Sequence, residues 1–232
     1  MNISLNKYLE QFAHDERIEL LQQKLLQRTR YICICLEDIY QSQNASAVLR
    51  TCEAFGIQDV HIIEDKNKYQ INPMVVKGSV KWLNLYKYNS LQPSYDAVKY
   101  LKNQGYRIVA TSPYGNNVAL EDFDITKGKT AVFFGTEYSG ISDTVRKNAD
   151  EFITVPMFGF VESFNISVSA AIILHHLIMQ LRKSEILWQL NEDEQNKVML
   201  QWLRSTIRSA DKIIELYETL HDNSENNEIN NE

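Results

Sequence analysis

The chain of 232 residues carries 24 basic and 30 acidic side chains, a formal net charge of −6. Hydrophobic residues make up 44% and charged residues 23%, which is ordinary globular usage and excludes a wholly disordered chain. No apolar run reaches the ~20 residues of a membrane span, and the acidic first residues lack the apolar segment of a signal peptide.

The first half of the chain alternates helical and strand patterns. Residues 5–29 place apolar side chains at helical spacing, which predicts one or two amphipathic helices. A continuous apolar run at 31–37 predicts a strand, and 44–56 has the pattern of a helix. Further strands are predicted at 59–64 and 82–88, on either side of an irregular basic stretch.

The second half continues this alternation. The predicted strands are 106–112, 130–135 and 151–156, and the predicted helices are 94–105, 141–149, 163–183, 192–206 and 207–220. The helix at 163–183 is apolar almost all round, so we expect it to be mostly buried. Apolar strands alternating with helices predict an α/β fold, with a mostly parallel sheet covered by helices on both faces.

The negative charge is concentrated at the end of the chain. Residues 184–232 hold 4 basic and 11 acidic residues, a net of −7, so residues 1–183 have a net of +1. The polar, acidic stretch 221–232 is predicted to be disordered. The acidity therefore does not exclude a nucleic-acid partner, because a binding face can be local. The candidate phosphate contacts are Lys24, Arg28, Arg30, Lys77, Lys81, Arg146 and Lys147.

Three loops that follow predicted strands contain more Gly, Pro and short polar residues than a plain connection needs, namely 111–117, 135–140 and 155–165. Ligands in such sheets bind beyond the carboxyl ends of the strands. Gly135 and Gly140 would permit close backbone approach or positive φ. There is no GxGxxG or GxxxxGK[ST] motif, which disfavours the usual dinucleotide and nucleoside triphosphate sites.

Several reactive side chains have a structural interpretation beside a functional one. The three cysteines match no metal spacing and indicate reduced thiols in a cytoplasmic protein without a metal site; a core position is favoured for Cys52. His175 and His176 lack an HExxH pattern and are interpreted as packed, hydrogen-bonded residues, and the loop serines lack a nucleophile elbow. Two alternatives stay open: Tyr138 would stack on a base or cover a loop, and Arg50 would act in the site or form a surface salt bridge.

Three segments together, 44–56, 132–142 and 153–171, resemble the three motifs of the SpoU/TrmH family of SPOUT methyltransferases in order and spacing. The resemblance covers roughly residues 30–182. It implies methyl transfer from S-adenosyl-L-methionine to a ribose 2′-hydroxyl of RNA, by a homodimer. It also implies a deep trefoil knot in the C-terminal half of the core, with the chain from about 130 to 183 threaded.

Within this family, the chain looks like the tRNA (guanosine-18-2′-O)-methyltransferases, because its N-terminal extension is short and helical. The corresponding division of the chain is an N-terminal helical extension (1–30), a knotted methyltransferase domain (31–183), a C-terminal helical extension (184–220) and a disordered acidic tail (221–232). A ribosomal RNA methyltransferase of the same family and a non-catalytic RNA-binding protein are the alternatives.

The resemblance assigns roles residue by residue. The catalytic positions are Arg50, Asn44, Glu137, Ser163 and Asn165. The cofactor-binding positions are Thr111, Ser112, Gly135, Gly140, Ile153, Val155, Pro156, Met157 and Phe164. The tRNA enzymes have an arginine further along the last knot helix, where this chain has Met179, and Arg182 one turn later is the candidate substitute.

Overall fold

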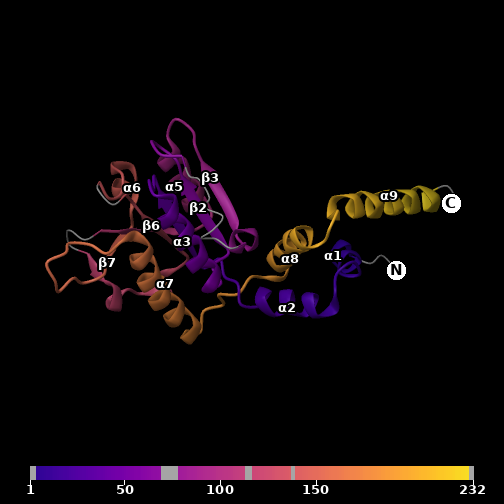
Figure 1. Cartoon of the computed structure of the whole chain (residues 1–232), viewed down its shortest axis with the longest axis horizontal. Coiled ribbons are helices and arrows are strands. Elements are labelled where there is room, and N and C mark those ends of the chain that lie inside the picture. The colour runs from indigo at the N-terminus through magenta and orange to yellow at the C-terminus, as the bar shows by residue number, and fades with distance from the viewer. Residues whose placement is uncertain (1–3, 69–77, 113–116, 137–138, 230–232) are drawn as a thin grey trace. The chain divides into compact units, whose positions relative to one another are not determined.

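The structure, a computed structural model, describes residues 4–68, 78–112, 117–136 and 139–229, the last nine of these by backbone alone (Figure 1). The contacts divide these residues into two compact units. One unit contains residues 29–189, and the other is formed by the described residues up to Arg28 together with those from Leu190 onward.

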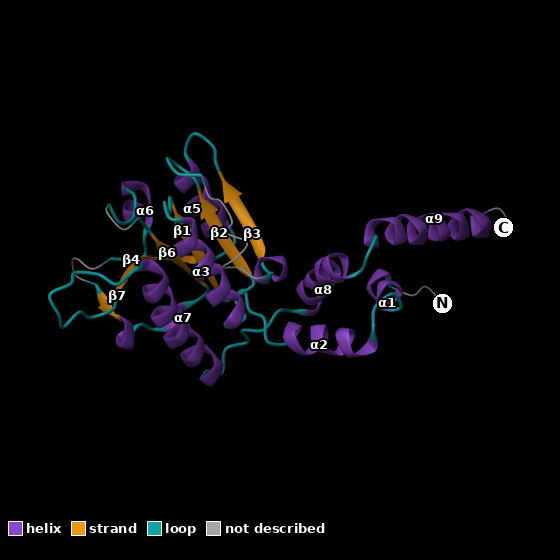
Figure 2. Cartoon of the chain, viewed as in Figure 1, coloured by secondary structure: helices purple, strands orange, loops and turns teal. Residues whose placement is uncertain are grey.

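The unit of residues 29–189 is built on a seven-stranded sheet in the order β3-β2-β1-β6-β4-β7-β5. Its strands are β1 (Ile32–Glu37), β2 (Asp59–Ile63), β3 (Asn84–Tyr88), β4 (Arg107–Thr111), β5 (Val118–Ala119), β6 (Thr130–Phe134) and β7 (Glu151–Thr154). All neighbouring strands are parallel. Its α-helices are α3 (Ser42–Ala54), α5 (Pro93–Asn103), α6 (Asp143–Asn148) and α7 (Ile166–Lys183) (Figure 2).

Strand β1 is buried on both faces of the sheet, which explains why its first five residues are all apolar. Ile32, Ile34 and Leu36 belong to the core cluster that α3 and α7 share. Cys33 and Cys35 point to the opposite cluster, which contains residues of α5 and α6. A strand with helices on both sides has no solvent-facing positions, so period-two alternation is lost. The predicted α/β fold with helices on both faces is therefore confirmed.

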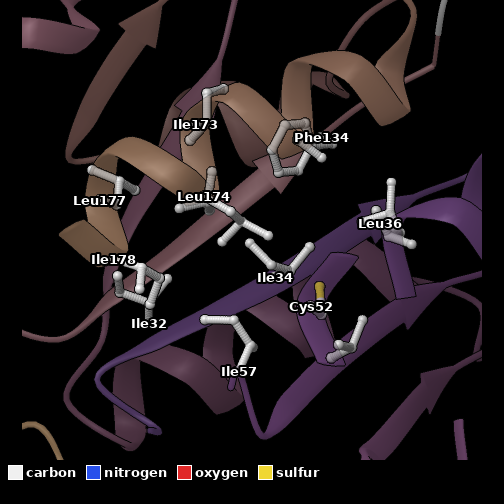
Figure 3. Close-up of a cluster of buried hydrophobic side chains, with 14 of the residues drawn as sticks. Ile32, Ile34, Leu36, Cys52, Ile57, Phe134, Ile173, Leu174, Leu177 and Ile178 are labelled. Carbon is white, nitrogen blue, oxygen red and sulfur yellow. The ribbon is translucent and has the colours of Figure 1, made fainter. Parts of the chain in front are cut away.

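Helix α7 supplies the largest share of the first cluster. Ile173, Leu174, Leu177 and Ile178 point toward Ile32, Ile34 and Cys52 in Figure 3. These four side chains follow the i, i+1, i+4, i+5 spacing of one helix face. The opposite face, with Val168, His175 and Met179, is exposed, and only 7 of the 18 residues of α7 are buried, so the expectation that this helix is mostly buried is wrong.

Element boundaries differ from the predicted ones where short helices intervene. The strand expected at 82–88 begins at Asn84, because Ser79–Trp82 form a 3-10 helix. The two-residue strand β5 was not predicted, since Val118 and Ala119 are too few to produce a periodic pattern.

The other unit contains α1 (Leu5–Glu10), α2 (Asp15–Leu25), α8 (Glu192–Thr206) and α9 (Ala210–Ile229). Tyr8 of α1 packs against Tyr217 of α9 with ring centroids 5.1 Å apart. The guanidinium of Arg28 lies 5.0 Å from the ring centre of the buried Trp202. Arg28 is itself buried, so its interpretation as an exposed phosphate contact is wrong.

Helix α9 continues through residues 221–229, which differs from the disorder expected there. The segment lacks Gly and Pro, so no residue in it stops a helix that has already begun. The final residues of the predicted tail, 230–232, lie outside the described residues.

Two chain segments meet at Thr29, at the start of the sheet-containing unit. Thr29 forms β-bridges with both Ile57 and Gln189, and its hydroxyl donates to the carbonyl oxygen of Trp188 at 2.6 Å. The first and last residues of this unit are therefore adjacent. No helix in the described part of the chain is long and apolar enough to cross a membrane.

Candidate functional site

A cavity of about 340 Å³ lies at the carboxyl ends of β4, β6 and β7. This is the position where parallel α/β sheets bind ligands, and the volume falls in the usual range for small-molecule sites. One part of its wall is apolar and consists of Phe134, Ile141, Ile153, Ile166 and Ile173. The remaining lining is mixed: Val155, Met157 and Phe164 add apolar surface, and the other residues add hydroxyl, backbone and charged groups. The cavity therefore suits a ligand with an apolar ring and a polar chain.

The loop after β6 forms one side of this cavity and is folded tightly on itself. Thr136 and Gly140 exchange two backbone hydrogen bonds, with N···O distances of 2.9 and 3.1 Å. Gly140 has φ +67°, the left-handed conformation that glycine adopts without strain. A Cβ at Gly135 would overlap the backbone of Gly140 and Ile141. Both glycines are thus required by the backbone geometry that shapes the cavity wall.

The structure brings together most of the residues that the resemblance assigned to cofactor binding. Eight of them line the cavity, namely Thr111, Ser112, Gly135, Gly140, Ile153, Val155, Met157 and Phe164. Pro156 is not a lining residue and instead lies between two that are, Val155 and Met157. Thr111 is fixed by a hydrogen bond from its hydroxyl to the carbonyl oxygen of Phe133, at 3.0 Å.

The residues assigned to catalysis are only partly assembled around the cavity. Ser163 lines it. Asn165 caps α7 by accepting from the Ser167 N–H at 2.9 Å, and its Nδ2 donates to Oδ1 of Asn44 at 3.1 Å. This bond joins the first motif, on α3, to the third, before α7. Glu137 lies outside the described residues, as does Tyr138.

Arg50 does not line the cavity. It follows Asn44 by six positions on α3, which corresponds to about 1.7 turns and ~9 Å along the helix axis. Its side chain is exposed, whereas Asn44 is buried. The motif that carries both residues therefore presents them on different sides of α3.

The cavity also contains residues that the sequence did not single out as ligand-binding. Ser169 and Ile173 follow Ile166 by one and two turns of α7, so helical spacing from the third motif would have found them. Arg146 and Glu162 bring opposite charges to the lining. The sequence suggests Arg146 only as a phosphate contact. No local sequence pattern distinguishes Arg146 or Glu162 from an ordinary solvent-exposed charge.

Arg182, Met179 and Arg30 do not line the cavity. Arg182 stacks on Trp188 at 4.7 Å, and Met179 is exposed. Arg30 forms an ion pair with Asp59, with Nε 3.0 Å from Oδ2. Of the other phosphate candidates, Lys24, Lys81, Arg146 and Lys147 are exposed and Lys77 lies outside the described residues.

The histidines and cysteines have no arrangement suited to metal binding in the described ranges, where no cluster of three His, Cys, Asp or Glu side chains occurs. His175 packs on Phe55, as the packed interpretation expects, although its side chain is exposed. His176 Nε2 has no hydrogen-bond partner among the described residues, contrary to the predicted hydrogen-bonded histidine. Burial raises the pKa of the Cys52 thiol, which keeps it protonated and unreactive.

One histidine, His61, is buried in an aromatic cluster on the α5 side of β2 and β3. Its ring stacks on Tyr86 with centroids 4.7 Å apart, and Nδ1 lies 3.0 Å from the hydroxyl of Tyr88. Burial lowers the pKa of His61 to about 4, so the ring is neutral at physiological pH. This cluster is separate from the cavity lining.

Known proteins resemble the chain in both sequence and structure. Residues 31–175 match the SpoU rRNA Methylase family. A protein of Borreliella burgdorferi named tRNA (guanosine(18)-2'-O)-methyltransferase is 45% identical over 201 residues, which cover 87% of this chain and 90% of that protein.

Two solved structures extend the comparison. The TrmH/SpoU tRNA modifying enzyme of A. aeolicus has a TM-score of 0.74 at 27% identity, covering 84% of this chain and 98% of its own. The SpoU methyltransferase AviRb of Streptomyces viridochromogenes, in complex with the cofactor AdoMet, has a TM-score of 0.59 at 22% identity and covers 70% of this chain and 62% of its own.

Proposed function

This chain belongs to the SpoU rRNA methylase family, and we propose that it methylates the ribose 2′-hydroxyl of guanosine 18 in tRNA, with S-adenosylmethionine as methyl donor. The observation that carries the tRNA substrate is the 45% identity, over 87% of the chain, to a protein named for that reaction. The chemistry of the cavity lining supports the assignment of S-adenosylmethionine as the cofactor. A tRNA substrate in turn supports a cytoplasmic location.

The cavity residues fit S-adenosylmethionine by their chemistry. An apolar wall of five side chains, from Phe134 to Ile173, suits the adenine ring. The tight turn after β6 is fixed by the backbone hydrogen bonds between Thr136 and Gly140, so it presents a preformed wall to the cofactor. When bound, the cofactor supplies an electrophilic methyl group on sulfonium. The loops around Ser163 and Gly140 line the cavity, so they would hold the cofactor in a fixed orientation.

The ribose hydroxyl must lose its proton as it attacks. Arginine is a poor base because its guanidinium is protonated under all ordinary conditions. We assign to Arg50 the role of binding a substrate phosphate and stabilising charge on the attacking oxygen, while the phosphate or a water molecule takes the proton. The Asn44–Asn165 hydrogen bond positions α3 for this task. Glu137 and Ser163 are further catalytic candidates in the same proposal.

A homodimer explains why Arg50 is exposed and outside the cavity of its own chain. The exposed face of α7 carries the apolar side chains Val168 and Met179, and α7 packs beside α3 through Phe55 and His175. Two copies that pair through this face would bring Arg50 of one chain near the site of the other. The trefoil knot implied for residues 130–183 belongs to the same proposal.

The reaction is tested with purified protein, labelled S-adenosylmethionine and unmodified tRNA, with the label mapped by mass spectrometry. We expect one 2′-O-methylguanosine, at position 18, and no label on a transcript with 2′-deoxyguanosine there. Label confined to ribosomal RNA would replace the tRNA assignment by the ribosomal one. RNA binding without label or cofactor binding would favour the non-catalytic alternative.

The role of Arg50 is tested by Arg50→Ala. Losing one stabilising contact to a developing oxyanion costs ~3 kcal/mol, so turnover should fall ~100-fold or more. Binding of S-adenosylhomocysteine should be unchanged, since Arg50 does not line the cavity. Near-normal turnover would refute the assignment.

The dimer is tested by mixing Arg50→Ala with Gly135→Val, whose side chain overlaps the cavity loop. Random pairing restores about a quarter of wild-type activity if Arg50 serves the partner's cavity. If Arg50 serves its own chain, the mixture stays inactive.

A further inference from the structure

Glu37 is a buried carboxylate outside the cavity. It ends β1 and is 3% exposed. Its oxygens accept hydrogen bonds from the Ser142 N–H at 2.8 Å, from the Ser142 hydroxyl at 2.7 Å and from the hydroxyl of Ser94. A buried carboxylate requires such donors, because removing it from water is costly otherwise.

These bonds attach the far end of the cavity loop to the sheet. The loop starts at Gly135, immediately after β6, and β6 is paired with β1 through Leu36 and Phe134. It ends at Ser142, which Glu37 holds. Gly135, Thr136, Ser139, Gly140 and Ile141 all line the cavity. Both ends of this cavity wall are therefore attached to the last two residues of β1.

Ser142 makes a second interaction that further restricts its position. Its hydroxyl accepts from the Val145 N–H at 3.2 Å and so caps α6. The same hydroxyl donates to Glu37. A serine hydroxyl has one proton and can accept as well as donate, so the two bonds are compatible. Ser142 thus connects β1, α6 and the cavity loop.

We propose that Glu37 is a positioning residue for the cofactor: it holds Ser142, and through it the preceding wall residues Ser139, Gly140 and Ile141, in the shape that binds S-adenosylmethionine. The inference rests on the proposed function, because it takes the cavity as the cofactor site. Glu37 touches no cavity space itself and acts only through the loop. Weakening its bonds therefore changes affinity for the cofactor more than the rate of the chemical step.

The neighbouring residue provides a matched control. Asp38 is also a buried carboxylate, and it accepts from the backbone N–H groups of Lys66 and Asn67 at 2.8 and 2.7 Å. Those residues follow β2 and do not line the cavity. Asp38 has φ +54°, which asparagine also tolerates. Asp38→Asn thus perturbs a comparable buried network that holds a different loop.

The experiment measures S-adenosylhomocysteine binding by titration calorimetry on the full chain, with urea unfolding in parallel. Glu37→Gln should raise Kd about tenfold, because the amide replaces one acceptor oxygen by a donor. Ser142→Ala, which keeps the backbone N–H, should raise it about threefold. Asp38→Asn should leave Kd within about twofold, although its unfolding midpoint falls too. In methyl transfer, Glu37→Gln should raise KM for S-adenosylmethionine and leave kcat nearly unchanged.

Each alternative result has a distinct meaning. The inference would be overturned if Kd shifted equally in Glu37→Gln and Asp38→Asn, or if it shifted in neither Glu37→Gln nor Ser142→Ala. Glu37 would then contribute to the stability of the fold only. If Glu37→Gln does not fold, an unchanged Kd in Ser142→Ala would overturn it alone. Absence of binding by the wild-type chain would refute the cofactor site itself, and this inference with it.

Discussion

Gly135 and Gly140 offer a direct test of how the cavity loop works, because alanine perturbs them in different ways. At Gly135 a Cβ overlaps the backbone of Gly140 and Ile141, so the loop must move. At Gly140 a Cβ meets nothing within 4 Å, but φ is +67°. Gly159, in the loop after β7, has neither a close neighbour nor a positive φ and is the control.

The expected magnitudes follow from these geometries. Forcing backbone apart costs about 1–3 kcal/mol, and because the loop can shift, the cost should appear as a ~5- to ~150-fold loss of cofactor affinity. Left-handed alanine costs ~1–2 kcal/mol, but this strain is present with and without the cofactor. It therefore lowers mainly the free energy of unfolding, where the less flexible unfolded chain offsets ~0.4–1 kcal/mol of it, and Gly140→Ala should weaken binding by no more than ~5-fold.

The assay is calorimetric titration of S-adenosylhomocysteine into the three variants and the wild type. The predicted order of Kd is Gly135→Ala above Gly140→Ala, with Gly159→Ala equal to wild type. If Gly135→Ala bound normally, or if Gly140→Ala were the more damaging change, the close approach of the loop to itself would not be what shapes the cavity.

Three further outcomes are expected. Leu174→Ala, in the fully buried face of α7, should lower the free energy of unfolding in urea by ~2–5 kcal/mol, whereas the exposed Lys183→Ala should change it by less than ~0.5 kcal/mol. The pKa of His61 is about 4 in the folded state, below the 6.5 of an unperturbed histidine, so the unfolded chain takes up the proton first. Stability should then fall by about 2 kcal/mol as pH drops from 7.5 to 5, a loss that urea titrations of His61→Gln should not show. Removing residues after 220 should leave methyl transfer intact in the labelling assay, and tRNA affinity should fall with added salt; loss of activity would contradict the peripheral role of the acidic tail.

The layered fold was predictable because its signals are local. Residues 32–36 of β1 and 131–134 of β6 are continuous apolar runs without polar alternation, which itself indicates helices on both faces. The predicted boundaries of elements were wrong where tertiary packing outweighed the hydrophobic pattern of the sequence. Trp82 fits an apolar strand but belongs to a 3-10 helix, and the exposed apolar face of α7 reads like a buried one because hydropathy alone does not show what covers it.

Only the loop residues of the site could be predicted from the sequence. Gly135, Gly140 and the third motif mark the cavity because unusual backbone requires unusual residues. Glu37 carries no such signal: a charge at the end of an apolar strand is ordinarily exposed, and its partner Ser142 is 105 positions away. Arg50 was recognisable as a motif residue, but its exposure on α3 depends on three-dimensional packing.

The pairing of Thr29 with Gln189 has a practical consequence for dissecting the protein. Residues 29–189 begin and end at one point, the arrangement that tolerates excision or insertion into a host loop. The helical unit is assembled from both chain ends, so cutting at one end leaves half of it. An N-terminal deletion would strip Arg28 from Trp202 and expose an aromatic surface to aggregation. Separating residues 29–189 from the helical unit therefore requires two cuts. A truncation at one end alone would damage the helical unit, and the resulting loss of activity could be mistaken for loss of a functional residue.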